Sequence, residues 1–142
     1  MQINVKIKFL IIFLLNFILL SLPTNSEEFN ITAKEVLIDN DKETLVGIGS
    51  VEAVDTEGKM INAEKITYEK SREFLLLEEK VKIVDIEGNI LKTDKATYDK
   101  FNEKIITYSN TEVFLNEGYK LISKNILYDT KNKILSSNAN SL

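Results

Sequence analysis

A thirty-residue repeat constrains the fold of this chain more than any other feature of its sequence. The segment "EGKMINAEKITYEK" at 57–70 returns as "EGNILKTDKATYDK" at 87–100 and as "EGYKLISKNILYDT" at 117–130. A glycine column and a tyrosine column coincide at this shift: Gly58, Gly88, Gly118, Tyr68, Tyr98 and Tyr128. A fixed period of this length predicts an architecture in which each unit adds a layer to a stack.

Each unit predicts two strands and two turns. Turns such as "DTEG" at 55–58 place a glycine where the backbone needs a conformation that costs other residues more. A second, polar set of turns includes "EKSRE" at 69–73 and "DKFNE" at 99–103. Between the turns lie runs of about ten residues rich in Ile, Val, Thr and Tyr, which is a strand composition. The apolar positions do not keep a 3.6-residue period, so helix is the weaker interpretation.

The apolar pattern changes phase in the middle of the first strand of each unit. In "MINAEKITY" the residues that match across units are Ile61, Ala63, Ile66 and Tyr68. Strict alternation would instead place 61, 63, 65 and 67 on one face. A β-bulge or a sharp bend after the small residue would bring all four onto one inner face. The same skip occurs in the other units, at Ala33–Val36, Thr93–Ala96 and Ser123–Ile126.

These patterns predict a mainly β fold of bent, stacked strands, folded over an apolar interior. The first and last strands of such a stack expose unpaired backbone groups. The residues that we expect to line the interior are Val51, Ala53, Ile61, Ala63, Ile66, Tyr68, Val81, Ile83, Leu91, Ala96 and Tyr98.

The composition argues against several classes of function. The chain has no Cys and no His, which excludes disulfides and thiolate metal sites and removes the commonest general base. The segment "DNDKE" at 39–43 lacks the central Gly and the distal Glu of a calcium loop. Residues 27–142 carry 16 basic and 22 acidic residues, interspersed, so no basic stripe for nucleic acid is present. We therefore expect no catalytic residues, no metal, no cofactor and no nucleic-acid partner.

Repeated polar residues have structural interpretations. We expect each repeated Tyr to pack with its hydroxyl at the rim, and the acid after it to form the turn. Asp55 and Asp85 share a column in which the third copy has Leu115, which favours a structural role over a carboxylate pair.

The first 26 residues are typical of a secretory signal peptide. Lys6 and Lys8 precede a stretch from 9 to 20 that is apolar except for Asn16, and Thr24 and Ser26 suit a cleavage site. The alternative is an uncleaved anchor, although a spanning helix needs about 20 apolar residues. Either way, we expect residues 27–142 to form one domain outside the cytoplasm. Because "SSNANSL" at 136–142 occupies a mid-strand column, we expect a longer protein or a partner to complete that layer.

The motif of an apolar residue, a small residue, two polar residues, an apolar residue and then Tyr-Asp/Glu resembles the OstA-like domain of the lipopolysaccharide transport (Lpt) family. The chain carries it as "INAEKITYE", "LKTDKATYD" and "LISKNILYD", with "ITAKEVLID" as a weaker first copy, and "GSVEAVDTEGKMINAE" also matches. The resemblance covers about residues 28–138. The family includes a soluble periplasmic bridge protein, an anchored inner-membrane partner and the periplasmic N-terminal region of the outer-membrane LPS-assembly protein. The mid-strand ending favours the last of these, then the bridge protein, and an uncleaved leader would favour the anchored partner.

The resemblance implies an OstA-like β-jellyroll of bent antiparallel strands. It implies a periplasmic module, with outer-membrane association if the chain is the assembly protein. The eleven interior residues would form a groove that shields the acyl chains of lipopolysaccharide. Neighbouring Lpt jellyrolls would join head-to-tail by edge-strand pairing, and the outer-membrane assembly machinery would be a further partner. The alternative is a structural or adhesive β-repeat at the cell surface, with an interior filled by side chains and no lipid.

Overall fold

The computed structural model of the chain describes residues 28–137. The predicted signal peptide at 1–26 and the segment 138–142 lie outside the described residues. Within the described part, no helix has the length and apolar character that crossing a membrane would require.

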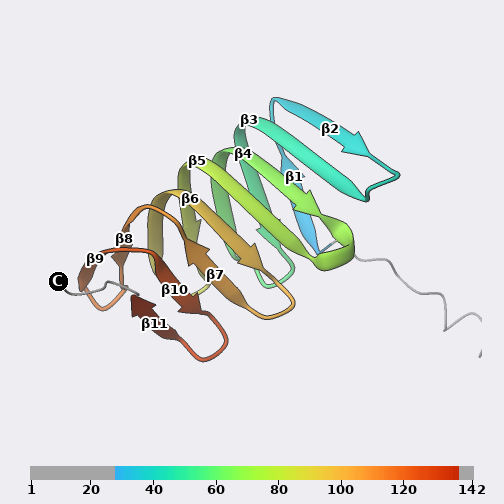
Figure 1. Cartoon of the computed structure of the whole chain (residues 1–142). Helices are drawn as coiled ribbons and strands as arrows, with labels where there is room; N and C mark the ends of the chain where they lie inside the picture. The colour runs from blue at the N-terminus through green and yellow to red at the C-terminus, as the bar shows by residue number, and fades with distance from the viewer. Residues whose placement is uncertain (1–27, 138–142) are drawn as a thin grey trace, which may run out of the picture.

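The described residues form strands connected by short turns (Figure 1). Their bounds are β1 Phe29–Thr32, β2 Glu35–Asp39, β3 Thr44–Asp55, β4 Met60–Glu69, β5 Phe74–Val84, β6 Ile90–Asp99, β7 Lys104–Thr107, β8 Asn110–Phe114, β9 Lys120–Lys124, β10 Ile126–Asp129 and β11 Ile134–Ser137, with a 3-10 turn η1 at Lys70–Arg72. The predicted mainly β fold is therefore confirmed.

The strands belong to one antiparallel sheet that is folded over along its length (Figure 1). The long strands β3, β4, β5 and β6 run through both halves of the folded sheet. In the first half the order is β2-β3-β4-β5-β6-β7-β10-β11, and in the second half it is β1-β3-β4-β5-β6-β8-β9. Each end of the stack is thus divided into two shorter strands, because β1 and β2 both pair with β3 while β7 and β8 both pair with β6.

The predicted change of phase is confirmed in β4, where Ile61, Ala63, Ile66 and Tyr68 are all buried. The extra residues that permit it lie on the neighbouring strands rather than on β4 itself. The register shifts in β3 at Gly49 and Ser50, and in β5 at Glu79 and Lys80, and all four residues have positive φ. A bulge on alternate strands bends the whole sheet, because each bulged strand is paired on both sides.

The phase change takes another form at the two ends of the stack. Between Ala33 and Val36 the chain leaves β1 and enters β2, and at Asn125 (φ 54°) it leaves β9 and enters β10. Val36 is 42% exposed, although its repeat mates Ile66, Ala96 and Ile126 are buried. The reason is that β2 ends the sheet and has a neighbour on one side only.

A row of directly opposed residues runs along the whole first half of the sheet. From Leu45 onward, aliphatic residues alternate with tyrosines on successive strands, and Ile38 occupies a tyrosine position at the start of the row. The row comprises Ile38, Leu45, Tyr68, Leu75, Tyr98, Ile105, Tyr128 and Leu135. Phe29 of β1 packs edge-on against Tyr68 and Tyr98, with ring centroids 5.1 and 6.0 Å apart. Such aromatic contacts contribute about 0.5–1.5 kcal/mol beyond the area that they bury.

Both predicted sets of turns are present, and they form the two rims of the folded sheet. The glycine rim comprises the turns at 55–59, 85–89 and 115–119, in which Gly58, Gly88 and Gly118 have φ of 86–94°. The opposite rim comprises the turns at 39–43, 69–73, 99–103 and 129–133, which close on Glu43, Glu73, Glu103 and Lys133 with φ of 48–58°. We call the line along which the two rims meet the mouth.

Candidate functional site: the interior and its mouth

The eleven residues predicted to line the interior are all 0–5% exposed. They come from β3, β4, β5 and β6 and pack into one core with other buried residues, namely Phe29, Leu75, Leu77, Ile105, Val113 and Ile126. The interior position of each predicted residue is therefore as expected. Their contact with a lipid stays a prediction.

The bend of the sheet becomes polar toward the C-terminal end. Thr93, Thr107 and Thr111 are buried there, and Thr111 Oγ1 lies 2.8 Å from Thr107 Oγ1 and 3.1 Å from Thr93 Oγ1. Thr107 Oγ1 also accepts a hydrogen bond from the backbone N–H of Ile126 at 2.9 Å. These hydroxyls satisfy backbone groups where β6 gives way to β7 and β8, as buried polar groups require.

A cluster of buried charges closes the mouth in the middle of the stack. Asp55 Oδ1 accepts the backbone N–H groups of Glu57 and Lys59 at 3.0 and 2.9 Å, which fixes the glycine-rim turn. The ammonium of Lys59 reaches the opposite rim, where it lies 3.4 Å from Glu103 Oε2 and donates to the hydroxyl of Tyr98 at 2.5 Å. The same ammonium lies 4.4 Å from the centre of the Tyr98 ring, at cation–π distance.

Lys100 makes the reverse connection, from the opposite rim to the glycine rim. Its ammonium lies 3.0 Å from Glu57 and 3.7 Å from Asp55, and 2.7 Å from Glu103 within its own turn. The side chains of Asp55, Lys59 and Lys100 are 0%, 5% and 7% exposed. Removing one partner of such a buried pair is costly, because the remaining charge loses its compensation.

The pKa values in this cluster reflect burial and pairing. Burial, with the charge of Glu103 next, raises the pKa of Tyr98 far above its usual value of 10.0. Burial alone would lower the pKa of Lys100, but its hydrogen bonds to Glu103 and Glu57 raise it above 10.5. Burial would raise the pKa of Glu103, but hydrogen bonds from Lys100 and Thr130 hold it below 4.5. The cluster therefore favours neutral Tyr98 beside charged Lys100 and Glu103.

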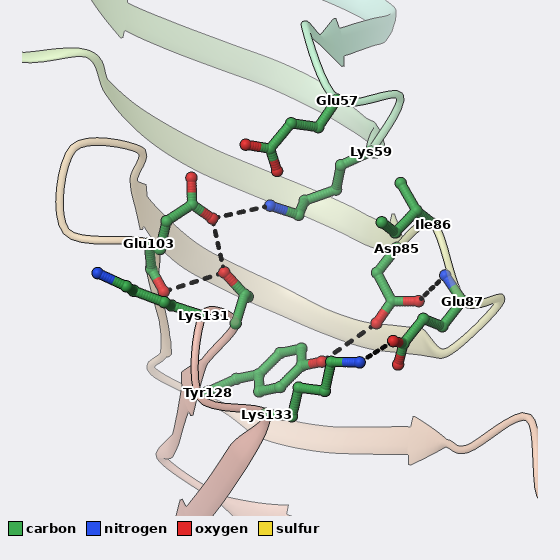
Figure 2. Close-up of a pocket in the computed structure, with 10 residues that line it drawn as sticks. Glu57, Lys59, Asp85, Ile86, Glu87, Glu103, Tyr128, Lys131 and Lys133 are labelled. Carbon is green, nitrogen blue, oxygen red and sulfur yellow. Dashed lines mark hydrogen bonds and ion pairs between the residues drawn. The ribbon is translucent and has the colours of Figure 1, made fainter.

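One unit further along, the same positions carry a more exposed set of contacts (Figure 2). The hydroxyl of Tyr128 donates to Asp85 Oδ2 at 3.1 Å, and Lys133 pairs with Glu87. The side chains of Lys133 and Glu87 are 63% and 38% exposed. Burial and the charge of Asp85 raise the pKa of Tyr128 to about 12.

A cleft of about 220 Å³ lies between these two sets of contacts. Figure 2 shows Lys59 and Glu103 on one side of it and Asp85, Tyr128 and Lys133 on the other. Glu57, Ile86, Glu87, Thr130 and Lys131 complete its lining. The cleft thus sits on the mouth, between the rims and not in the apolar interior.

The structural interpretations of the repeated polar residues are confirmed in the units of Tyr98 and Tyr128, whereas the side chain of Glu69, after Tyr68, makes no capping hydrogen bond in its turn. The hydroxyls of Tyr98 and Tyr128 lie at the mouth, and Asp85, like Asp55, accepts backbone N–H groups within its own turn. Asp99 and Asp129 accept the N–H of the residue three positions on, as turn formers do.

Sequence reasoning missed the charge cluster across the mouth. A signal was present, because the repeat changes residue type at the position that follows each turn glycine: Lys59 becomes Asn89 and then Tyr119. Such a departure from the repeat marks a side chain whose surroundings differ between layers. Within residues 28–137, no group of three or more metal-ligating side chains is suitably placed to hold a metal ion.

Comparison with known proteins identifies the class of fold. No protein-family model and no curated protein matches the sequence. Among solved structures, the chain is similar to LptH of Pseudomonas aeruginosa, described as the LptA homologous periplasmic component of the conserved lipopolysaccharide transport device. The TM-score is 0.69 at 13% identity, over 82% of this chain and 93% of that chain.

The fold is therefore the β-jellyroll of the Lpt proteins, as the OstA-like motifs implied. At this level of identity the similarity concerns the fold, and function has to be argued from the site.

Proposed function

We propose that this chain is a periplasmic lipopolysaccharide transport module of the OstA-like kind. It shields acyl chains in its apolar interior and joins neighbouring Lpt jellyrolls through its edge strands. The observation that carries the proposal is a folded sheet with a mainly apolar interior, whose terminal strands have a neighbour on one side only within residues 28–137. The similarity to LptH, a periplasmic transport component by its description, supports it.

The energetics suit this role. An acyl chain of about a dozen carbons gains on the order of 10 kcal/mol on leaving water. An apolar interior supplies most of that gain without precise geometry, and residues such as Ile66, Leu77 and Ile83 provide such a surface. Because these residues pack against one another in this structure, a chain would enter only as they part.

The strand directions favour one route for joining two copies. Along the first half of the sheet, successive antiparallel pairings leave β11 opposite in direction to β2. A second copy stacked in the same orientation would therefore add its β2 antiparallel to β11, which continues the sheet. Along the second half, β9 has the same direction as β1, so the same stacking would bring two parallel edges together.

Exposed apolar side chains at the two ends agree with this route. Val36, Leu37 and Ile38 of β2 are exposed at one end and Ile134 of β11 at the other. Joining Ile38 of one copy to Leu135 of the next would extend the row of opposed aliphatic and tyrosine residues without a break. Two Cys substitutions in this Cys-free chain, Ile38→Cys and Leu135→Cys, should then give disulfide-linked oligomers. As the matched control, Ile31→Cys in β1 with Ile122→Cys in β9 should not.

The second candidate function is a structural or adhesive β-repeat without lipid. The full burial of all eleven predicted lining residues favours it, because an interior closed by its own side chains needs no ligand.

Photocrosslinking separates the two functions. A photoreactive residue at Ile66 or Ile83, in cells that make lipopolysaccharide, should give adducts that carry lipid. Lys65 and Lys82, the exposed neighbours on the same strands, are the matched controls and should give none. Reproducible absence of lipid adducts at every inner position would favour the structural repeat. N-terminal sequencing of the exported protein would test cleavage after residue 26 and with it the periplasmic location.

A further inference from the structure

The mouth is sealed unequally along the stack. Phe29, Lys59 and Asn89 occupy equivalent positions in successive units. In the first unit the buried ring of Phe29 packs on Tyr68. In the second, the buried ammonium of Lys59 is held by Asp55, Glu103 and Tyr98. The seal therefore begins as an aromatic contact and continues as a buried ion cluster.

The third unit has the weakest seal of the three. Its charged contact, between Lys133 and Glu87, is solvent-exposed, and Tyr128 is only half-buried while it donates to Asp85. Exposed ion pairs contribute little to stability, whereas breaking a buried one is strongly destabilising. Local opening follows the least stable contacts. The rims should therefore part first at the third unit, while the Lys59 cluster holds the second.

The cleft lies where that parting would begin. Its volume of about 220 Å³ is below the roughly 300–1,000 Å³ of ordinary small-molecule sites, so it does not enclose a ligand as it stands. However, Tyr128 both lines the cleft and packs against the hydrophobic core. Swinging Tyr128 away from Asp85 would connect the cleft to the apolar interior. Ile86, 70% exposed on the cleft wall, offers an apolar surface at the outside.

We propose that this cleft is the entrance through which a single acyl chain of an amphiphile reaches the interior. The contacts Lys133–Glu87 and Tyr128–Asp85 form the latch that opens, and Lys59 with Glu103 forms the fixed side. The inference rests on the proposed function, since it gives the interior's lipid a point of entry from the side of the stack.

A cross-link across the latch tests the entrance. The variant Glu87→Cys/Lys133→Cys, joined by a short bismaleimide, ties the glycine rim to the opposite rim at the third unit. The matched control is Glu112→Cys/Lys120→Cys, which joins another exposed ion pair but lies within the β8–β9 hairpin and does not cross the mouth. Both are made in the full chain, whose lack of other cysteines keeps the reaction specific. The probe is dansyl-undecanoic acid, whose fluorescence rises as its chain enters an apolar interior.

We expect the cross-link at 87 and 133 to slow uptake of the probe at least about tenfold relative to the same variant before cross-linking, equivalent to about 1.4 kcal/mol. The control cross-link should leave the rate within about twofold. Glu87→Gln, which removes the charge pair without a tether, should speed uptake by about 1.5- to 2-fold, because an exposed pair contributes little.

The outcomes separate the entrance from the function. If the probe binds and the cross-link at 87 and 133 leaves its rate unchanged, the entrance is wrong while the lipid-binding function stands. If the protein that is not cross-linked takes up no probe, the proposed function fails and the entrance fails with it. A rate that falls for both cross-links alike would also overturn the entrance, because it would reflect general stiffening.

Discussion

The N-terminal and C-terminal parts of the stack use the same backbone repeat for different interiors. Three columns at the bend show the change along the chain: Gly47, Leu77 and Thr107; Val51, Val81 and Thr111; and Ala63, Thr93 and Ser123. The N-terminal members are aliphatic residues or glycine, and the C-terminal members carry hydroxyls. The central strands β3 to β6 run unbroken through the bend, whereas the chain before them divides into β1 and β2 and the chain after them into β7 to β11.

This difference shows what a repeat controls and what it leaves open. The spacing of turns and apolar residues determines how many layers form and how they bend. The side chain at each repeated position then determines the character of the layer. At the bend, Val51 gives an apolar interior and Thr111 a hydroxyl-bearing one. At the mouth, the contacts of Lys59 are buried and those of Lys133 are exposed.

The largest expected effect distinguishes the two aspartates at the mouth. Asp55→Ala should lower the free energy of unfolding by about 3–5 kcal/mol, because it leaves Lys59 and Lys100 buried with fewer acids. Asp85→Ala, the repeat mate at the half-buried end, should cost only about 1–2 kcal/mol. Urea unfolding of both variants measures the two values. Equal losses would contradict the conclusion that the mouth is held more strongly at Asp55 than at Asp85.

Substitutions at the bend test the difference between its aliphatic N-terminal part and its hydroxyl-bearing C-terminal part. Thr111→Val should cost about 1–3 kcal/mol, because Thr93, Thr107 and the carbonyl of Ser109 lose their shared hydroxyl partner. Val51→Thr, in the equivalent column, should cost a similar amount because it buries a hydroxyl among aliphatic side chains. Thermal unfolding compares both with Thr56→Val, an exposed control in a turn. A Thr111→Val protein as stable as the parent would show that the hydroxyl network is dispensable.

Tyr128 should make the stability of the protein depend on pH in the alkaline range. Its folded pKa of about 12 lies above the usual 10.0, so the neutral hydroxyl is the form that folding favours. The stability that it contributes is complete below about pH 10 and is lost as the pH rises toward about 12. Because the group is partly exposed, we expect less than about 1 kcal/mol. Urea unfolding of Tyr128→Phe across this range should show a shallower loss than the parent protein, and parallel curves would argue against the Asp85 contact.

The smallest effect concerns the exposed ion pair. Glu87→Gln should change stability by at most about 0.5 kcal/mol, and the difference should disappear near 1 M salt, where screening acts within about 3 Å. The cost of Asp55→Ala should persist at the same salt concentration, since that pair is buried. Urea unfolding at low and high salt tests this contrast. A cost of Asp55→Ala that fell at high salt would contradict it.

Much of the fold could be predicted because it depends on local spacing. The glycine column predicted one rim, and the skip from Ala63 to Ile66 predicted the bend. Buried strands repeat their apolar residues because they share one interior. The bulge on β5 could not be predicted, since Glu79 and Lys80 are not residues that positive φ favours, whereas Gly49 suits the bulge on β3.

The charge cluster could not be predicted for a different reason. Lys59 and Glu103 are 44 positions apart, and their meeting depends on which turn of one rim faces which turn of the other. That offset is a property of the folded sheet, and sequence spacing within one unit does not contain it. The exposure of Val36 likewise depends on its place at the end of the stack.

The alternation of strand directions has a consequence for how such proteins can change in length. Each thirty-residue unit contributes two full strands, as β4 and β5 do. Gaining or losing a whole unit therefore preserves the direction of the outermost strands, while gaining or losing half a unit reverses it. A chain with one more whole unit would thus form a longer stack with the same edge directions at both ends.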